Sequence, residues 1–188
     1  MKIEATRSGY QFLMILFAEF FSVTLGQLLA AITPNFFVAS LLNPPVNIVF
    51  ALFCGVTIPQ PNLNVFWKYW MYELDPMTRI ISGMVVTELH DLPVVCKPSE
   101  LNTFTVPDGK TCGEYAKSWL ETAAGYVVDL NATGTCDYCA YKKGDEFYGP
   151  LGLSYDNRWR DLGILIAFCG SNLCLLYLAS KHMNFGRR

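Results

Sequence analysis

Apolar residues are concentrated in three runs, at about 10–33, 36–58 and 162–180, with polar segments around them. Each run approaches or exceeds the roughly 20 residues that a helix needs to cross the hydrocarbon core of a bilayer. Only the turn-forming tripeptide Thr33-Pro34-Asn35 separates the first two runs. The pattern therefore predicts three transmembrane helices, the first two of which form an antiparallel hairpin.

The second run is interrupted by Asn43-Pro44-Pro45. Proline lacks a backbone N–H and disfavours helix at the residue before it, so we expect a kinked or broken helix here. Irregular backbone at membrane depth is tolerated where it lines a cavity or packs inside protein. Beyond the prolines, a set of residues recurs at helical spacing and can share one face: Asn47, Ile48, Ala51, Leu52 and Gly55. That face is either a helix-packing surface or a wall of a substrate cavity.

The first run contains two strongly polar residues, Glu19 and Gln27. A carboxylate in the middle of a membrane is costly unless it faces protein or water. Two interpretations of Glu19 stay open. It is protonated or hydrogen-bonded at a helix–helix contact, or it belongs to a transport or coupling surface.

The segment 59–89 is aromatic and sparsely charged. Five of the seven residues from Phe66 to Tyr72 are aromatic, and Trp and Tyr favour the membrane–water interface. Asp75-Pro76 ends this helix, and Met77 to Leu89 resumes as a short amphipathic piece that contains Arg79. The segment therefore predicts a re-entrant or interfacial pair of helices.

The segment 90–160 is rich in turn-forming residues and contains four of the seven cysteines: Cys96, Cys112, Cys136 and Cys139. An even number of cysteines in such a segment suggests two disulfides and an oxidising compartment, and four cysteines allow three pairings. Asn131-Ala132-Thr133 is an acceptor sequence for N-glycosylation. We therefore expect a large extracellular loop, glycosylated at Asn131.

Other chemistry is poorly supported by the sequence. Cys136 and Cys139 have the spacing of a redox pair or half a zinc site, but no βαβ pattern and no nearby histidine accompany them, so structural disulfides are favoured. Gly109-Lys110-Thr111 resembles the end of a phosphate-binding loop, but Phe104 stands where that motif needs glycine. We predict no catalytic residues and no metal site.

Composition and charge agree with a membrane protein. Of 188 residues, 52% are hydrophobic and 16% charged, whereas soluble domains average about a quarter charged. The net charge of −2 gives no general attraction to nucleic acid. The tail contains Lys181, Arg187 and Arg188 without an acidic residue, so the positive-inside rule places the C-terminus in the cytoplasm. Three crossings then place Met1 outside, which is unusual for a complete protein and predicts a fragment of a longer one.

A series of motifs runs in a specific order through almost the whole chain. The motifs are Phe53-Cys54-Gly55-Val56, Phe66-Trp67 with Met71-Tyr72, Pro76 and Thr78, then Cys96, Thr111-Cys112-Gly113-Glu114-Tyr115, Gly125-Tyr126, Asn131-Ala132-Thr133 with Cys136 and Cys139, and Arg158-Trp159-Arg160-Asp161. In order and spacing they resemble the last part of fungal pleiotropic drug resistance transporters. These are full-length members of the G class of ABC transporters.

The resemblance implies a fold. Each transporter of this class has two halves, and each half has a nucleotide-binding domain followed by six spans; this chain resembles the last three spans of the second half. The implied fold class is mainly α and integral membrane, with three transmembrane helices, a re-entrant helical pair and a disulfide-bonded extracellular loop domain. The implied parts are 1–58 for the first two spans, 59–89 for the re-entrant helices, 90–160 for the Cys-rich loop, and 161–188 for the last span and cytoplasmic tail.

The resemblance also implies site residues. In this class the second span of the unit lines the drug cavity, which makes Ile48, Ala51 and Leu52 substrate-facing. Val56 would stand at the plug between the inner cavity and the outer exit. The disulfides would be nested, as Cys96–Cys139 and Cys112–Cys136.

The implied function is that of a membrane-domain fragment of an ATP-driven multidrug efflux transporter of the plasma membrane, with residues 59–160 extracellular. ATP and Mg²⁺ would be bound by nucleotide-binding domains outside this chain, so we expect no enzymatic activity of the chain itself. Its partners would be the lipid bilayer, the other transporter domains and hydrophobic small-molecule substrates. The alternative hypothesis is a small structural membrane protein whose disulfide-bonded loop binds extracellular partners.

Overall fold

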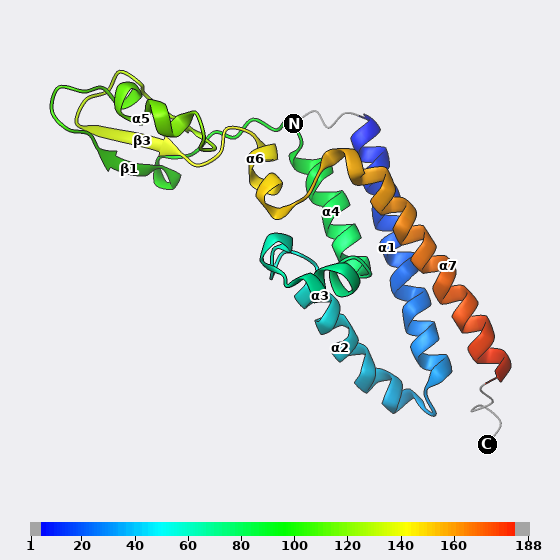
Figure 1. Ribbon diagram of the computed structural model, residues 1–188. Helices are drawn as coiled ribbons and strands as arrows, with labels where there is room; N and C mark the ends of the chain where they lie inside the picture. Colours follow the sequence, from blue (N-terminus) through cyan, green and yellow to red (C-terminus); the bar gives the residue numbers. More distant parts are fainter. Residues whose placement is uncertain (1–4, 183–188) are drawn as a thin grey trace. The chain divides into compact units, whose positions relative to one another are not determined.

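The computed structural model of the protein describes residues 5–182 (Figure 1). These residues form two compact units. The helical unit comprises the chain up to Glu88 and from Leu151 onward, and the disulfide unit comprises Leu89–Pro150. Each unit is described separately below.

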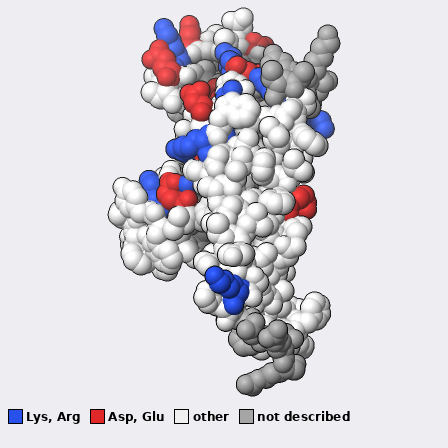
Figure 2. All heavy atoms as spheres, turned by 90° about the vertical axis from the view of Figure 1, so that its right-hand side faces the viewer, with Lys and Arg blue, Asp and Glu red and all other residues white. Residues whose placement is uncertain are grey.

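The helical unit is built on three long helices: α1 (Ala5–Ile32), α2 (Phe36–Phe53) and α7 (Arg158–His182). All three are long and apolar enough to cross a membrane, which confirms the prediction of three transmembrane helices. Asn35 caps α2, because its side-chain oxygen accepts a 3.0 Å hydrogen bond from the Val38 N–H. Figure 2 shows that the surface on the side of α7 is mostly free of charged side chains, as expected for helices in contact with lipid.

Helices α1 and α7 lie side by side (Figure 1) and form the core of this unit. The core consists of Tyr10, Met14, Phe21, Leu162, Leu165 and Cys169. Hydrogen bonds also join the described parts of the two helices: Tyr10 Oη donates to the Arg158 carbonyl at 2.7 Å, Asn172 Nδ2 donates to Thr24 Oγ1 at 3.3 Å, and Cys169 Sγ donates to the Phe17 carbonyl at 3.6 Å. In lipid, where apolar contact alone gives little preference for association, such interhelical bonds are each worth about 0.6–2 kcal/mol.

The sequence predicts that α2 is kinked or broken at its prolines, and the structure differs from the second of these alternatives and from the predicted end of the helix. The helix is not broken at Pro44 and Pro45, since the backbone is helical without interruption from Phe36 to Phe53. The two prolines remove only two donors of the helix ladder, and the Asn47 side chain donates to the Asn43 carbonyl at 2.9 Å, which adds a bond beside them.

The second difference is where α2 ends. The helix stops at Phe53 instead of continuing to residue 58, because Gly55 adopts a left-handed conformation with φ +86° just after the C-cap Cys54. This is the usual role of glycine at a helix C-terminus. Gly55 therefore does not lie on the helical face of Asn47, Ile48, Ala51 and Leu52, as the spacing had predicted.

The segment after α2 folds into short helical pieces. They are η1 (Gln60–Asn62), α3 (Val65–Trp67), η2 (Lys68–Tyr72, a turn of π-helix), and the longer α4 (Pro76–Leu89); η4 (Gly149–Leu151) and η5 (Tyr155–Asn157) precede α7. Helix α4 approaches α1 closely at Gly83. A Cβ atom at this position would lie 2.6 Å from Tyr10 Oη and 2.7 Å from Met14 Cε, so only glycine fits without a shift.

The disulfide unit contains a small antiparallel sheet in the order β1-β3-β2, formed by β1 (Asn102–Thr105), β2 (Tyr126–Val127) and β3 (Thr135–Cys139). Its helices are η3 (Pro98–Glu100), α5 (Cys112–Leu120) and α6 (Gly144–Tyr148). Helix α5 packs on the sheet through a core of Val106, Cys112, Ala116, Val127 and Cys136.

Two disulfides join β3 to α5 and to the segment before η3. They pair Cys96 with Cys139 and Cys112 with Cys136, at sequence separations of 43 and 24 residues. This is the nested arrangement that the family resemblance implies. Disulfides closing loops of such lengths typically stabilise a fold by about 2–4 kcal/mol each, which compensates for the small core of the unit.

Candidate substrate pathway and associated sites

The face of α2 that the sequence analysis singled out is uncovered in this chain. Ile48, Ala51 and Leu52 have the i, i+3, i+4 spacing of one helical face, and Ile48 and Leu52 are 58% and 43% exposed. Along the whole of α2 only Ala39 is buried. The helix therefore presents a nearly complete apolar surface that the described residues leave unpacked.

Val56 lies apart from this face, in the turn that follows Gly55, and is 61% exposed. The turn is held in two ways. A Cβ atom at Gly55 would lie 2.8 Å from a ring carbon of Tyr72, so the Tyr72 ring packs directly against the glycine. Thr57 Oγ1 donates to the Ala51 carbonyl at 3.1 Å. These contacts place Val56 at an exposed position beside the C-terminal end of α2.

Aromatic side chains from the segment after α2 pack against its end. The Phe53 and Trp67 rings stack at 5.5 Å, and Trp67 stacks on Trp70 at 5.9 Å. The aromatic composition of this segment by itself predicts only an interfacial position. In the structure these aromatic side chains also fix the short α3–η2 segment to the last turn of α2, next to the Val56 turn.

A buried polar cluster joins α4 to α7. Arg79 Nη1 donates to Asp161 Oδ1 at 3.3 Å, and Ser82 Oγ donates to Asp161 Oδ2 at 2.9 Å. Arg79 Nη2 also donates to the Glu73 carbonyl at 2.9 Å and pairs with the Glu73 carboxylate. Arg79 and Asp161 are 4% and 1% exposed and compensate each other in part, and Arg160 Nη2 also donates to Asp161 Oδ1 at 3.3 Å.

The sequence does not indicate this cluster. Arg79 is predicted in an amphipathic helix and Asp161 at the start of the last span, but no local pattern shows that residues 82 positions apart meet. The one feature of the sequence that could have indicated the pair is the presence of an arginine and an aspartate in predominantly apolar segments, where a charged residue needs a partner.

A cavity of about 150 Å³ lies among α1, α2 and α4. Its polar lining comes from Ser22, Asn43 and Asn47, and Phe50 and Ile80 are among its apolar walls. Asn43 and Asn47 thus line a space beside α2. Glu19 is exposed on α1, so the described residues do not bury it at a helix–helix contact.

In the disulfide unit, Asp145 is the centre of a polar cluster. Its carboxylate lies 2.7 Å from His90 Nδ1, and it accepts hydrogen bonds from the Tyr148 hydroxyl and, at 2.8 Å, from the Asp91 N–H. Burial alone would raise the pKa of Asp145, but these three hydrogen bonds outweigh it and hold the pKa at about 2. Lys143 Nζ donates to Asp91 at 2.9 Å, which lowers the pKa of Asp91 and raises that of Lys143.

The other sites from the sequence analysis can also be located. Asn131 is exposed, and its backbone N–H donates to Asp129 Oδ1 at 2.9 Å. Within residues 5–182, no group of three or more His, Cys, Asp or Glu side chains is placed to hold a metal ion.

Comparison with known proteins identifies the class. Residues 1–89 match the family model described as ABC-2 type transporter. Over 95% of its length, the chain is 57% identical to ABC multidrug transporter I of Aspergillus fumigatus. It is 38% identical over 94% of its length to ABC multidrug transporter G of the same fungus, and 38% identical over 92% to the brefeldin A resistance protein of Schizosaccharomyces pombe. The resemblance to fungal ABC multidrug transporters is thus confirmed.

The chain is much shorter than these relatives. It spans 12%, 13% and 11% of their respective lengths. What the relatives do as whole proteins therefore extends to this chain only as a proposal.

Proposed function

We propose that this chain is part of the membrane domain of an ATP-driven exporter of hydrophobic small molecules, and that α2 forms part of its substrate pathway. The observation that carries the proposal is the uncovered apolar face of α2 in a chain 57% identical to an ABC multidrug transporter. An apolar helix surface of this size needs a partner or a ligand. An apolar wall suits chemically varied substrates, since hydrophobic contact is not directional.

In this proposal, Ile48, Ala51 and Leu52 contact the substrate, and Val56 lies at the constriction through which substrate leaves. The stacked aromatics at the end of α2 and the Arg79–Asp161 pair keep this constriction fixed to α4 and α7. ATP and Mg²⁺ would be held by nucleotide-binding domains that are other parts of the complete transporter. Their closure would move α2 and release the substrate.

The same proposal places the disulfide unit outside the plasma membrane, the C-terminus in the cytoplasm, and the 59–89 segment as a re-entrant pair. Two oxidised cysteine pairs and the exposed Asn131 acceptor support the outside location of this unit. The alternative of a small structural membrane protein is less well supported, because the similar proteins are named as transporters. Reading the genomic sequence upstream of Met1 separates the two, since the exporter requires a nucleotide-binding domain and three more spans there.

The direct test is an export assay on the complete transporter with Ile48→Trp and Ala51→Trp. Each added indole projects from the exposed face of α2, so we expect export of the larger substrates to fall by about tenfold. The matched control is Leu175→Trp on α7, which is 50% exposed and lies outside the proposed pathway. Unchanged export of every substrate by both α2 variants would reject the pathway role of α2.

A further inference from the structure

Strand β1 is an edge strand of the sheet in the disulfide unit. Its one strand neighbour is β3, with Phe104 opposite Cys136. The Val106 N–H donates to the Gly134 carbonyl at 2.8 Å. In an antiparallel ladder, hydrogen-bonded residue pairs alternate with pairs that are not hydrogen-bonded to each other. The Val106 bond therefore implies that the N–H and C=O groups of Phe104 bond to β3. Those of Thr103 and Thr105 point away from β3, towards the free edge.

The side chains of β1, a strand of four residues, do not block its free edge. Natural edge strands are commonly guarded by lysine, proline or a bulge that prevents another strand from pairing. The sequence of β1 is Asn-Thr-Phe-Thr, with none of these, and Thr103 and Thr105 are both exposed. The outward backbone groups are thus available to an incoming strand.

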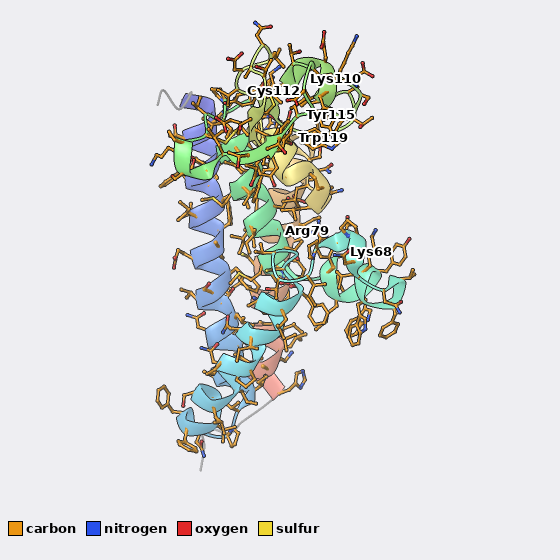
Figure 3. All side chains as sticks on the ribbon, turned by 90° about the vertical axis from the view of Figure 1, so that its left-hand side faces the viewer. Lys68, Arg79, Lys110, Cys112, Tyr115 and Trp119 are labelled. Carbon is orange, nitrogen blue, oxygen red and sulfur yellow. A yellow bond between two sulfur atoms is a disulfide. The ribbon has the colours of Figure 1, made fainter. Side chains whose placement is uncertain are left out.

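An aromatic groove lies beside this edge, between β1 and α5. It is lined by Phe104, Tyr115, Ala116 and Trp119 and has a volume of about 300 Å³. Tyr115 and Trp119, labelled in Figure 3, lie one turn apart on α5 and are 49% and 46% exposed. The Phe104 and Tyr115 rings are stacked at 6.4 Å. The groove can therefore accept one large apolar side chain from a segment that runs along β1.

Charge indicates what kind of segment fits. The disulfide unit, residues 89–150, contains five lysines and nine acidic residues, a net charge of −4. Glu100 and Asp108 lie just before and just after β1, in the same segments as Lys97 and Lys110, and Asp137 lies opposite Thr103 on β3, so that acidic residues exceed lysines here by one. Carboxylates in this arrangement attract a basic partner and repel a second copy of the same unit.

We propose that β1 and the aromatic groove form a docking site for an extended, basic polypeptide segment. The segment pairs with the outward groups of Thr103 and Thr105 and inserts one apolar side chain against Tyr115 and Trp119. A free strand edge beside an apolar groove is the arrangement used in recognition by strand addition, in which main-chain bonds give affinity and the groove gives specificity. The site is independent of the export function proposed above.

The test uses the 188-residue chain in lipid nanodiscs and a synthetic peptide of about nine residues, long enough to span β1. The peptide alternates Lys with Val or Thr and has one central Phe. A second peptide replaces every Lys by Glu, and a third has N-methyl groups on the alternate amides that would pair with β1. We expect the first peptide to bind in a titration, and the other two to bind at least about tenfold more weakly.

Variants of the chain test the same contacts. Trp119→Ala removes a wall of the groove and Thr103→Pro removes an outward donor at a position where an edge strand tolerates proline. Each is expected to weaken binding by about tenfold. Tyr141→Ala, which shortens an aromatic residue of the same unit outside the groove, is the control and should leave binding unchanged. Without any substitution, peptide binding should slow hydrogen exchange at the Thr103 and Thr105 amides.

The proposal is overturned if the N-methylated peptide binds as well as the first, because strand pairing is then not involved. It is also overturned if the glutamate peptide binds equally, or if hydrogen exchange at Thr103 and Thr105 is unchanged when peptide is bound. A small aromatic cation such as N-methylquinolinium that displaces the peptide without affecting those amides would reassign the groove to small molecules.

Discussion

At the scale of single residues, two glycines are required because neighbouring side chains leave no room for a Cβ atom. Gly55 ends α2 because it adopts a positive φ against the Tyr72 ring, and Gly83 lets α4 approach Tyr10 and Met14 on α1. Both glycines lie where a side chain would displace an aromatic ring. The positions of α4 and of the Val56 turn therefore depend on residues that have no polar function.

Gly83→Ala tests the approach of α4 to α1. Its new Cβ atom would lie 2.6 Å from Tyr10 Oη, and that hydroxyl is held by its bond to the Arg158 carbonyl. We expect a loss of about 1–3 kcal/mol in stability, from overpacking, seen as a lower unfolding temperature in detergent. Gly170→Ala on α7 is the control, because nothing lies within 4 Å of its Cβ position. Equal unfolding temperatures for the two variants would contradict the contact.

Asp145 gives the disulfide unit a dependence on pH. Its pKa in the folded chain, about 2, is below the ordinary value of 3.8, so the ionised carboxylate stabilises the fold. This contribution is fully present above pH 3.8 and is lost as the pH falls towards 2. We expect the Asp91 amide, which is bonded to Asp145, to become less protected in hydrogen exchange over this range. Asp145→Asn should remove that pH dependence, whereas Asp137→Asn should preserve it; a dependence retained in Asp145→Asn would contradict the assignment.

At the scale of elements, the joint between α4 and α7 is polar in surroundings that are largely apolar. Arg79 and Asp161 are buried together, and Ser82 and Glu73 satisfy part of their remaining hydrogen-bonding capacity. The ion pair can form at only one position of α4 along α7, so it fixes how the two helices are aligned. The apolar contacts between α1 and α7 do not fix an alignment in this way by themselves.

Arg79→Met tests this joint. Removal of the guanidinium leaves Asp161 buried with weaker compensation, so we expect a loss of about 3 kcal/mol in stability. Combining Arg79→Met with Asp161→Leu should recover most of that loss, since no buried charge then remains. Lys68→Met serves as the surface control (both basic residues are labelled in Figure 3) and should change stability by less than about 0.5 kcal/mol. A double variant less stable than Arg79→Met would contradict the pairing.

How far the sequence predicts these elements depends on the range of the interactions. The three long helices are predicted by apolar runs, because hydrophobic length is a local property. Of the kink or break predicted at Pro44 and Pro45, the break is absent, and α2 ends at Phe53 because of the conformation of Gly55, which the apolar pattern does not show. The Arg79–Asp161 pair and the groove between β1 and α5 join residues distant in the chain, and no local pattern indicates either.

At the scale of the whole molecule, the chain has membrane helices with unpacked apolar faces and a disulfide-linked unit with a strand edge and an aromatic groove. It spans 12% of the length of ABC multidrug transporter I of Aspergillus fumigatus, to which it is 57% identical. In the proposed exporter, the exposed face of α2 meets substrate and other membrane helices. We propose that the disulfide unit faces the outside and that its strand edge binds a basic segment.

The most direct test of this account determines on which side of the membrane the disulfide unit and the C-terminal end of α7 lie. Single cysteines are introduced at Val128 in the disulfide unit, where the side chain is 54% exposed, and at Lys181 near the end of α7. Intact cells expressing the complete transporter are then treated with a maleimide that cannot cross membranes, with the unsubstituted protein as background. The account predicts labelling of Val128→Cys in intact cells and of Lys181→Cys only after permeabilisation; the reverse pattern, or labelling of both from outside, would contradict it.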